Sequence, residues 1–309
     1  MTVIAADIGG SSTKVAELDG LRVLRASRLP HRGGEADLDA LEALVRSWQD
    51  DPTPAGPVAA AGLALPGVVD ATGVMRSVHD KVGSLVDRDL AGEVGGWLGV
   101  PVAVDNDARA AGWGEYVAGA GQGAEVLLTL TLGTGVGSSL VVGGVALRDG
   151  PGHRGVLGGH QQLLPEGPAC TCGRHGCLEA LASGWALPRV VAERREHHPP
   201  SSLPDDPGFA RVVEGAVTGD PLGRAVLDEL VGWWAVGIAN ACAVVGPDRV
   251  VLTGGLASAA PHVLDDLRRR VEALVWEPSA APDLRVAPDV WASATLGMAD
   301  HARHLLGKD

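Results

Sequence analysis

Short apolar runs alternate along the chain with segments in which apolar residues recur every three or four positions. Runs of Val, Ile, Ala and Leu that end at glycine, proline or aspartate predict buried strands, at residues 3–8, 58–65, 102–104, 125–132, 138–142 and 249–252. The helical spacing predicts helices at residues 38–48, 90–98, 108–118, 180–195, 208–218, 221–245, 261–274 and 292–306. Asp19-Gly20, between two further strand-like runs, predicts a hairpin turn. Strands that alternate with helices indicate an α/β fold.

The same order of elements occurs twice. A strand, a glycine-rich turn and a second strand open the chain, and this order restarts at residue 125 after a glycine-rich joint at residues 119–123. Only the order of the elements is repeated, and the amino-acid sequence itself is not. The repeated order suggests two halves built on one plan. We expect a small α/β domain at residues 1–118, joined by the C-terminal helix at residues 292–309, and a larger α/β domain at residues 119–291.

Composition and charge exclude several classes of protein. The formal net charge is −13 and Lys and Arg do not cluster, so we expect no binding of nucleic acid through its phosphates. No apolar stretch reaches about 18 uncharged residues and Asp7 interrupts the first apolar run, so we expect neither a membrane span nor a signal peptide. Three clustered cysteines and a distant fourth, Cys242, fit a metal site in the reducing cytoplasm better than a disulfide framework.

The segment at residues 152–179 contains a candidate metal site. Cys170, Cys172 and Cys177 follow a C-x-C-x4-C spacing, and His160 lies upstream of them. Three thiolates and one imidazole make a complete tetrahedral set for Zn²⁺ and leave no position open for water, so the metal is expected to be structural. The alternative is a cluster of small buried residues with a core histidine. Three cysteines within eight residues, amid glycine and proline, favour the metal site.

Glycine-rich turns follow three of the predicted strands. Glycine lets the backbone approach a phosphate group closely, and neighbouring hydroxyls and amides can donate to its oxygens. The candidate phosphate-binding residues are Asp7, Gly9, Gly10, Ser11, Ser12, Thr13 and Lys14 in the first turn, Gly133, Thr134, Gly135 and Gly137 in the second, and Gly254 and Gly255 in the third. A hairpin turn explains the first of them equally well. The three together favour a nucleotide site, with Mg²⁺ held by Asp7 directly or through water.

Asp105, Asn106 and Asp107 stand where a predicted strand gives way to a predicted helix. A carboxylate at this place could accept the proton of a substrate hydroxyl that attacks phosphorus, and the amide could orient that substrate. Asp and Asn are also favoured helix N-caps. The residues alone leave capping open as the role of Asp105 or Asn106.

Taken together, these segments resemble the ROK family of bacterial sugar kinases and related repressors, within the sugar kinase/heat-shock ATPase/actin superfamily. The matching motifs run in the family's order across nearly the whole chain: DIGGSSTK, LPGVVD, VAVDNDARAAGWGE, LTLGTGVGSS, GGHQQ through ACTCGRHGCLEALAS, and VVLTGGL. The cysteine segment is the most specific of them. Repressor members carry an N-terminal helix-turn-helix, whereas this sequence begins at the phosphate loop, so we expect a kinase.

The resemblance implies two actin-like (ribonuclease H-like) α/β domains that close on a cleft, with ATP and Mg²⁺ on one side and a sugar on the other. It implies that Asp107 is the general base for the primary hydroxyl of the sugar. It also implies sugar contacts from Gly67, Asn106, His160 and Glu179, so that the loop pinned by zinc forms a wall of the sugar pocket. A homodimer is expected from the family.

Three positions depart from the family's pattern. Leu157 replaces the glutamate of the usual E-I-G-H motif, and no acid lies between Asp149 and Glu166 to take its place. Leucine accepts no hydrogen bond, so a sugar hydroxyl that faces it loses its partner, which disfavours plain glucose. Asp80 stands where Asn is common and would favour a substrate with an ammonium group, unless it is only a surface acid. Arg109 replaces the common Asn or Ala and is interpreted as a surface change.

The sequence therefore predicts an ATP-dependent kinase for the primary hydroxyl of a glucose-like substrate, such as an amino sugar (kanosamine) or a C7 cyclitol. The alternative is a catalytically inactive sugar-binding protein that acts as a sensor or regulatory subunit. Retention of Asp7, Asn106, Asp107 and Glu179 favours the kinase. Polyphosphate is a less favoured donor than ATP, because no basic groove is evident in the sequence.

Overall fold

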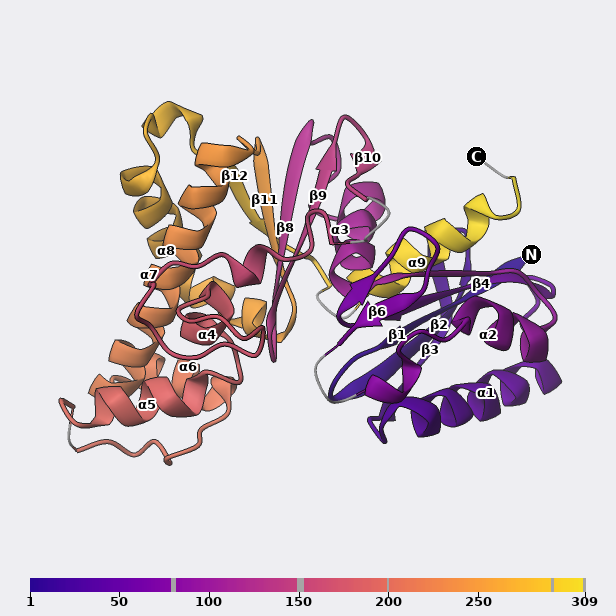
Figure 1. The fold of residues 1–309 in the computed structure, drawn as a ribbon, viewed down its shortest axis with the longest axis horizontal. Helices are drawn as coiled ribbons and strands as arrows, with labels where there is room; N and C mark the ends of the chain where they lie inside the picture. The colour runs from indigo at the N-terminus through magenta and orange to yellow at the C-terminus, as the bar shows by residue number, and fades with distance from the viewer. Residues whose placement is uncertain (79–81, 149–152, 199, 290–291, 308–309) are drawn as a thin grey trace. The chain divides into compact units, whose positions relative to one another are not determined.

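The computed structural model describes residues 1–78, 82–148, 153–198, 200–289 and 292–307. They form an α/β fold with mixed sheets (Figure 1), which confirms the predicted fold class. The chain separates into two compact units. Unit 1 comprises Met1–Gly123, Ser139–Val156 and Trp291–Asp309, and unit 2 comprises Ala124–Ser138 and Leu157–Val290.

Unit 1 contains a five-stranded sheet in the order β3-β2-β1-β4-β7. Its strands are β1 (Thr2–Ile8), β2 (Ser12–Asp19), β3 (Arg22–Pro30), β4 (Val58–Leu65) and β7 (Val102–Asn106). The first three strands form an antiparallel meander through the predicted turn at Asp19-Gly20, and β4 and β7 run parallel to β1. Because parallel strands share a direction, the carboxyl ends of β1, β4 and β7 meet at one edge of the sheet. Asp7 and Asn106 lie at that edge.

Helices cover both faces of this sheet. In Figure 1, α1 (Gly34–Asp50) and α2 (Leu90–Leu98) lie on one face, and α3 (Asp107–Ala118) and α9 (Ser293–His304) lie on the other. Side chains of β1 alternate between the two cores, as the twofold period of a strand requires. Ile4, Ala6 and Ile8 pack in the core with α1 and α2, whereas Val3 and Ala5 pack in the core with α3 and α9.

Helices α3 and α9 approach closely because small residues line their crossing. A Cβ on Gly297 would lie 1.9 Å from the carbonyl oxygen of Ala110, and one on Gly114 would lie 2.0 Å from that of Ser293. No side chain fits at either position. The C-terminal helix is thereby fixed against the helix that begins at Asp107.

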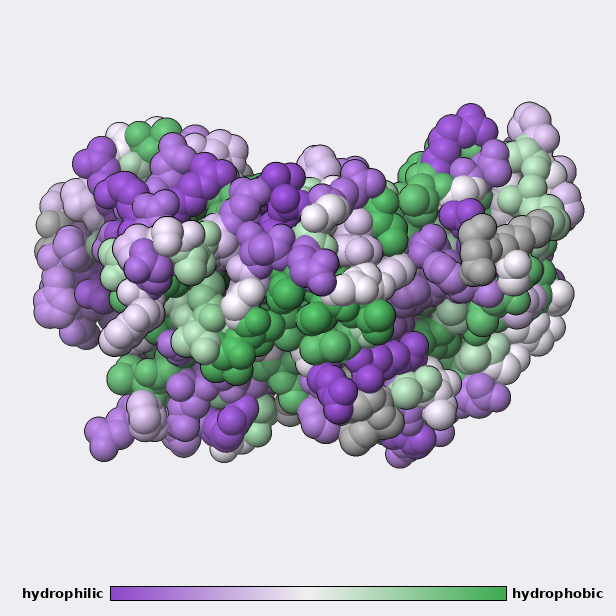
Figure 2. Space-filling view, turned by 90° about the horizontal axis from the view of Figure 1, so that it is seen from above, coloured by the Kyte–Doolittle hydropathy of each residue, from purple (hydrophilic) through white to green (hydrophobic). Residues whose placement is uncertain are grey.

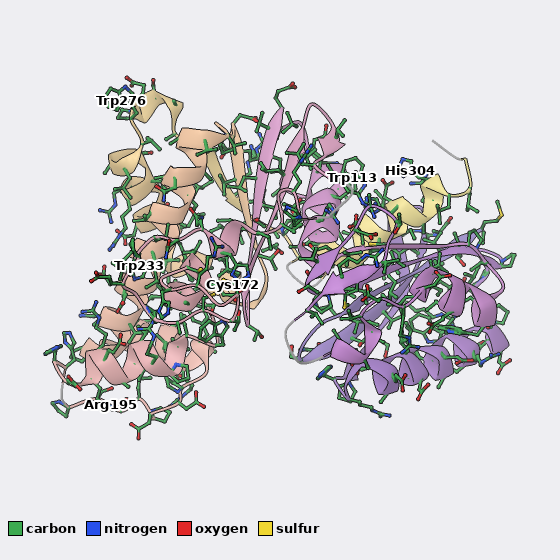
Figure 3. All side chains as sticks on the ribbon, in the orientation of Figure 1. Trp113, Cys172, Arg195, Trp233, Trp276 and His304 are labelled. Carbon is green, nitrogen blue, oxygen red and sulfur yellow. The ribbon has the colours of Figure 1, made fainter. Side chains whose placement is uncertain are left out.

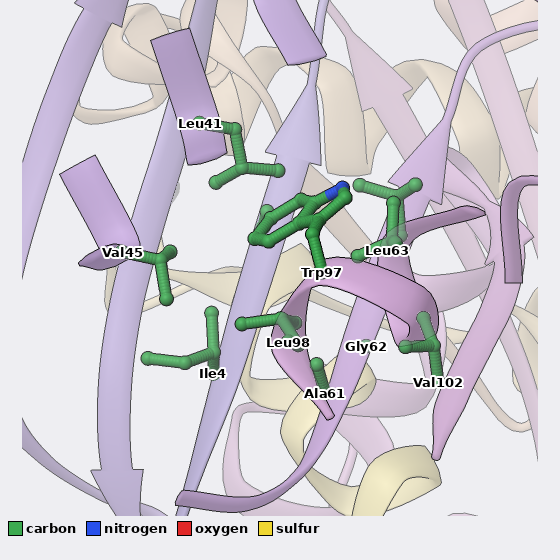
Figure 4. A pocket seen from close by; sticks show the side chains of 11 residues that line it. Ile4, Leu41, Val45, Ala61, Gly62, Leu63, Trp97, Leu98 and Val102 are labelled. Carbon is green, nitrogen blue, oxygen red and sulfur yellow. The ribbon is translucent and has the colours of Figure 1, made fainter. Parts of the chain in front are cut away.

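A small cavity lies in the other core, between β1, β4, α1 and α2 (Figure 4). Its volume is about 10 Å³, and its lining is apolar apart from the indole nitrogen of Trp97. A space of this size holds at most one water molecule, and one polar partner is too few to hold it there. The cavity is a packing gap and not a ligand site.

A short hairpin follows β4. Strands β5 (Val68–Val69) and β6 (Met75–Ser77) pair antiparallel, and a 3₁₀ turn at Gly83–Leu85 precedes α2. The hairpin begins directly after Gly67, whose φ of 81° lies in the left-handed region that glycine tolerates.

The second sheet has the strand order β10-β9-β8-β11-β12. These strands are β8 (Val126–Leu132), β9 (Val136–Val142), β10 (Val145–Ala146), β11 (Arg249–Thr253) and β12 (Asp283–Val286), and β8, β11 and β12 run parallel. The helices of unit 2 are α4 (Leu178–Ala182), α5 (Leu187–Arg195), α6 (Phe209–Thr218), α7 (Pro221–Val244) and α8 (Ala260–Leu274), with 3₁₀ turns at Gly158–His160, Gly255–Ala259 and Pro278–Ala280.

Two features of unit 2 differ from the sequence-based expectation. The single helix predicted at residues 180–195 is wrong, because Ser183 has extended backbone and separates α4 from α5. The amides of Gly184 and Trp185 donate to the carbonyl oxygens of Gly133 and Thr134 instead of continuing the helix. Strand β12 was not predicted, since it is a four-residue edge strand with a single buried residue.

Among the helices that the described ranges contain, none is both long and apolar enough to cross a membrane. Polar residues cover much of the face drawn in Figure 2, and smaller apolar areas lie between them.

Candidate active site

Unit 1 places Asp7 beside Lys14 at the end of β1. The antiparallel register pairs the two residues, and Lys14 Nζ lies 2.6 Å from Asp7 Oδ2. Asp7 is buried, and Lys14 supplies the counter-charge that a buried carboxylate requires. A carboxylate at a strand end, next to a glycine turn, is a suitable oxygen ligand for Mg²⁺, and the donor set therefore fits the expected ion.

The turn between β1 and β2 exposes only part of the predicted phosphate loop. The amide of Gly9 donates to the carbonyl oxygen of Ser12 at 3.1 Å and closes the turn. Ser11 is exposed, whereas the side chains of Ser12 and Thr13 are buried, and Ser12 Oγ accepts a hydrogen bond from Arg28 Nε at 3.0 Å. Ser11 therefore has the most accessible of the three hydroxyls proposed for phosphate binding.

The junction of β7 and α3 is organised by Asn106. Its Oδ1 accepts a hydrogen bond from the amide of Arg109 at 2.9 Å, so Asn106 is the N-cap of α3, and this confirms the capping interpretation for that residue. Its Nδ2 donates to the carbonyl oxygen of Gly67 at 2.7 Å and to Asp107 Oδ1 at 3.0 Å. One side chain thus fixes the helix start, the loop after β4 and the neighbouring carboxylate.

Asp107 has one occupied and one open carboxylate oxygen. Oδ1 accepts from the amide of Ala108 at 2.7 Å as well as from Asn106, and among the described residues nothing donates to Oδ2. Burial raises the pKa of Asp107 to about 7, and the negative charge of Asp7 adds to the rise, whereas Ala108, Lys14 and Asn106 act in the opposite direction. A carboxylate with a pKa near neutrality is suited to accept a proton as a general base.

This pKa leads to a prediction for the pH dependence of turnover. Asp107 must be ionised to accept a proton, so kcat/KM should fall about tenfold for each pH unit below about 7 and level off above it. Initial rates between pH 5 and pH 9 at constant ionic strength would measure this profile. A kcat/KM that stays constant down to pH 5 would exclude Asp107 as the base.

Arg109 is part of the interior behind this junction. It is 1% exposed, and its guanidinium lies 2.6 Å from Asp105 Oδ1. The interpretation of Arg109 as a surface change is therefore wrong. Asp105 is itself buried, and the arginine supplies its counter-charge.

Unit 2 contributes a second glycine loop, at residues 133–137 between β8 and β9. Glu179, at the start of α4, holds this loop: its Oε2 accepts a hydrogen bond from the amide of Val136 at 2.9 Å. A Cβ on Gly135 would lie 2.5 Å from the same oxygen, so the contact requires glycine. Glu179 Oε1 accepts from the hydroxyl of Thr171 at 3.1 Å, in the cysteine segment. One carboxylate therefore connects the glycine loop with the cysteine segment.

The cysteine segment brings the four predicted metal ligands together. The ligand atoms of His160, Cys170, Cys172 and Cys177 all lie within 4.8 Å of one another. Cys172 Sγ is 3.7 Å from Cys177 Sγ, close to the edge of about 3.8 Å that a tetrahedron with Zn–S bonds of 2.3 Å requires. The donor set and its spacing fit a structural Zn²⁺ ion. Figure 3 labels Cys172 in this segment, near α4.

The remaining predicted residues fall in three groups. Gly254 and Gly255 follow β11 as expected, and Gly254 has a φ of 85°. Leu157 directly precedes the 3₁₀ turn that contains His160, and its side chain is 40% exposed. Asp80 lies outside the described residues.

Three contributors to the site were missed in the sequence. Thr171 stands between two metal ligands, which draw attention away from it. Val136 contributes through its backbone amide, which the identity of its side chain does not reveal. Asp105 and Arg109 pair across a strand-to-helix junction. The spacing of four residues between Asp105 and Arg109 was the one visible signal. That spacing does not identify a helical pair here, because Asp105 belongs to a strand.

Comparisons with known proteins place these features in one family. The ROK family matches residues 3–304. A glucokinase of Streptomyces coelicolor is 34% identical over 221 residues, which cover 67% of this chain and 68% of that protein. A bifunctional enzyme NanE/NanK of Brucella melitensis is 33% identical over 307 residues, which cover 97% of this chain and 54% of the enzyme, so the chain spans about half of that relative.

The fold comparison agrees. The crystal structure of a ROK family glucokinase from Streptomyces griseus, in complex with glucose and AMPPNP, superposes with a TM-score of 0.86 at 29% identity and covers 98% of this chain and 100% of that one. The family match extends over nearly the whole sequence and includes the cysteine segment, both glycine loops and the Asn106-Asp107 junction. The chain belongs to the ROK family.

Proposed function

We propose that the chain is an ATP-dependent sugar kinase that transfers the γ-phosphoryl group of ATP to the primary hydroxyl of a glucose-like substrate. The observation that carries the proposal is the carboxylate of Asp107, with Oδ1 fixed, Oδ2 open and a pKa near 7. The glucokinase relative and the solved relative with glucose and AMPPNP support it.

In the proposed reaction, Asp107 Oδ2 accepts the proton of the primary hydroxyl while the hydroxyl oxygen attacks the γ-phosphorus. The new O–P bond forms as the bond to ADP breaks, and the proton remains on Asp107 until product release. Asn106 keeps the carboxylate in position through its bond to Oδ1. Mg²⁺, held by Asp7, would neutralise phosphate charge.

The glycine turns are assigned to the nucleotide. Gly9 and Gly10 would let a phosphate approach the first turn closely. The hydroxyl of Ser11 and the amides of Thr134 and Gly135 would donate to phosphate oxygens, and the backbone at residues 254–255 would approach the nucleoside. Bare backbone suits this task because it admits a phosphate or a ring at close range.

The cysteine segment is assigned to the sugar. In this proposal Zn²⁺ holds the segment rigid, so that His160 and Glu179 meet the substrate in a fixed orientation. Each oxygen of Glu179 accepts one hydrogen bond from Val136 or Thr171 and retains lone-pair capacity for a sugar hydroxyl.

Leu157 bears on substrate choice. It occupies the place of the family's glutamate, and a hydroxyl that faces it would be desolvated without a partner. We therefore infer that the preferred substrate lacks or replaces that hydroxyl, as an amino sugar such as kanosamine or a C7 cyclitol would. A coupled assay of ATP consumption over glucose, N-acyl hexosamines, kanosamine and cyclitols would test this, and robust turnover of glucose alone would refute it.

Restoring the carboxylate provides a direct test of Leu157. Leu157→Glu should raise kcat/KM for glucose by about 10- to 100-fold, because a charged acceptor would again pair with the hydroxyl. Leu164→Glu is a matched control, since Leu164 lies in the same segment and is also 40% exposed. It should leave glucose kinetics unchanged. An equal response of the two variants would show that added charge, and not the position, causes the effect.

The alternative function is a sugar-binding protein without catalysis. It would gain support if ATP bound and no sugar of the panel were phosphorylated. The homodimer remains a prediction, which light scattering of the purified protein would test.

A further inference from the structure

A buried ion pair lies directly behind the proposed catalytic aspartate. Asp105 and Arg109 are each 1% exposed. Arg109 Nε and one terminal nitrogen both lie 2.6 Å from Asp105 Oδ1, which also accepts the amide of Asn106 at 2.6 Å. Desolvating two charges is costly, so a buried pair contributes little net stability compared with apolar residues of the same size. A role beyond stability would account for its presence.

Helix formation does not explain Arg109 either. It is the third residue of α3, and the first turn of a helix carries partial positive charge, which disfavours a cation there. The capping requirement of this turn is already met by Asn106. The arginine is therefore held at an electrostatically unfavourable place by its other contacts.

Those contacts join the start of α3 to the hairpin after β4. A terminal nitrogen of Arg109 donates to the carbonyl oxygen of Val69 at 3.0 Å. Two residues earlier, the carbonyl oxygen of Gly67 accepts from Asn106 Nδ2. The segment at residues 67–69 is thus tied to the helix start at two points, and Asn106 in turn holds Asp107.

The other charged groups near Asp105 are more distant. Arg148 and His301 lie 3.7 and 3.6 Å from Asp105 Oδ2, which has no hydrogen-bond partner among the described residues. Arg148 instead donates to the carbonyl oxygens of Asp70 and Val104. Neither Arg148 nor His301 makes the close contact through two nitrogens that Arg109 makes with Asp105.

We propose that Arg109 is a positioning residue. With Asp105 as its counter-ion, it holds residues 67–69 against the start of α3. Asn106 and Asp107 are thereby kept in position for phosphoryl transfer. This inference rests on the proposed function for its kinetic consequence. Its structural consequence, a rigid junction at residues 105–109, does not depend on the substrate.

The kinetic test compares three variants. Arg109→Met should lower kcat by about 10- to 100-fold with less than about threefold change in KM for ATP, because a displaced base slows chemistry more than it weakens nucleotide binding. Arg109→Lys keeps the charge without the planar fork and should recover only part of the loss. The double variant Asp105→Asn/Arg109→Met leaves no unpaired buried charge and should regain near wild-type thermal stability while kcat stays low.

A matched control separates positioning from stability. Arg25 pairs at 2.7 Å with Glu17, a buried carboxylate in the same unit but on β2, away from the junction. Arg25→Met should lower the melting temperature and leave kcat unchanged at a temperature where the protein is folded. If the double variant at residues 105 and 109 recovers wild-type kcat together with stability, Arg109 is only structural and the proposal is overturned.

Hydrogen–deuterium exchange provides a readout that needs no substrate. Peptides that cover residues 102–112 should exchange faster in Arg109→Met and in the double variant than in the wild type, and not in Arg25→Met. Unchanged exchange there would refute the positioning role even if kcat fell. A different outcome is that the wild type phosphorylates no sugar while Arg109→Met still exchanges faster than the wild type in this region. That result would refute the kinase function and support the positioning role of Arg109.

Discussion

Replacing Asp107 by Asn should lower kcat by about 10²- to 10⁴-fold, the usual contribution of a general base. Asn keeps the size of the side chain and can accept the hydrogen bonds that now fix Oδ1, but it cannot take a proton from the substrate. Sugar affinity should change little. A coupled assay of ADP release measures kcat, and calorimetry measures sugar binding.

The same variant predicts a pH-dependent gain in stability. The folded-state pKa of Asp107 is raised to about 7, so the stability that its protonated form contributes is complete below the unfolded pKa and is lost as pH rises through about 7. Asp107→Asn should therefore exceed the wild type in melting temperature at pH 8 by more than at pH 5. Asp19→Asn, in an exposed ion pair with Arg22, serves as the surface control and should show neither effect. Retained turnover in Asp107→Asn would reject its role as the base.

Removing the zinc site should produce the second large effect. The purified wild type should contain about one Zn²⁺ per chain, and Cys172→Ser should contain almost none, because loss of one ligand of four opens a closed tetrahedral site. Thr171 and Glu179 link this segment to the glycine loop, so kcat/KM should fall by about 10- to 100-fold. Metal analysis and steady-state kinetics on the same sample test both statements.

The fourth cysteine supplies the control for this experiment. Cys242 lies in α7, outside the cluster, and Cys242→Ser should retain the metal and full activity. A zinc-free Cys172→Ser protein with wild-type kinetics would show that activity does not require the metal. Retention of zinc in Cys172→Ser would place the metal elsewhere.

Most of the fold was accessible from the sequence because its elements have strong local signals. The strand at residues 58–65 and the helix at residues 90–98 were predicted with the bounds that the structure has. The prediction failed where tertiary contacts decide: α4 and α5 separate because Gly184 and Trp185 hydrogen-bond to a loop about 50 residues earlier in the chain. The spacing of apolar residues within the segment cannot reveal such a distant contact.

The candidate site divides in the same way. The metal ligands and the Asn106-Asp107 junction could be recognised because their residue types and spacing are unusual. Residue type does not reveal burial, so the sequence predicts a surface position for Arg109 and a phosphate-binding hydroxyl for Thr13, although both residues are buried. Which partners a carboxylate keeps, as with Glu179, depends on backbone amides that carry no signal in the sequence.

The central claim, ATP-dependent phosphorylation of a primary sugar hydroxyl, is tested most directly by identifying the product. The protein would be incubated with γ-labelled ATP, Mg²⁺ and each substrate of the panel, and the label would be located by mass spectrometry and phosphorus NMR. We expect label on the primary hydroxyl of a glucose-like substrate, with kanosamine or a cyclitol preferred to glucose and no label transferred by Asp107→Asn. Binding of ATP and sugar without label on any sugar would contradict the account.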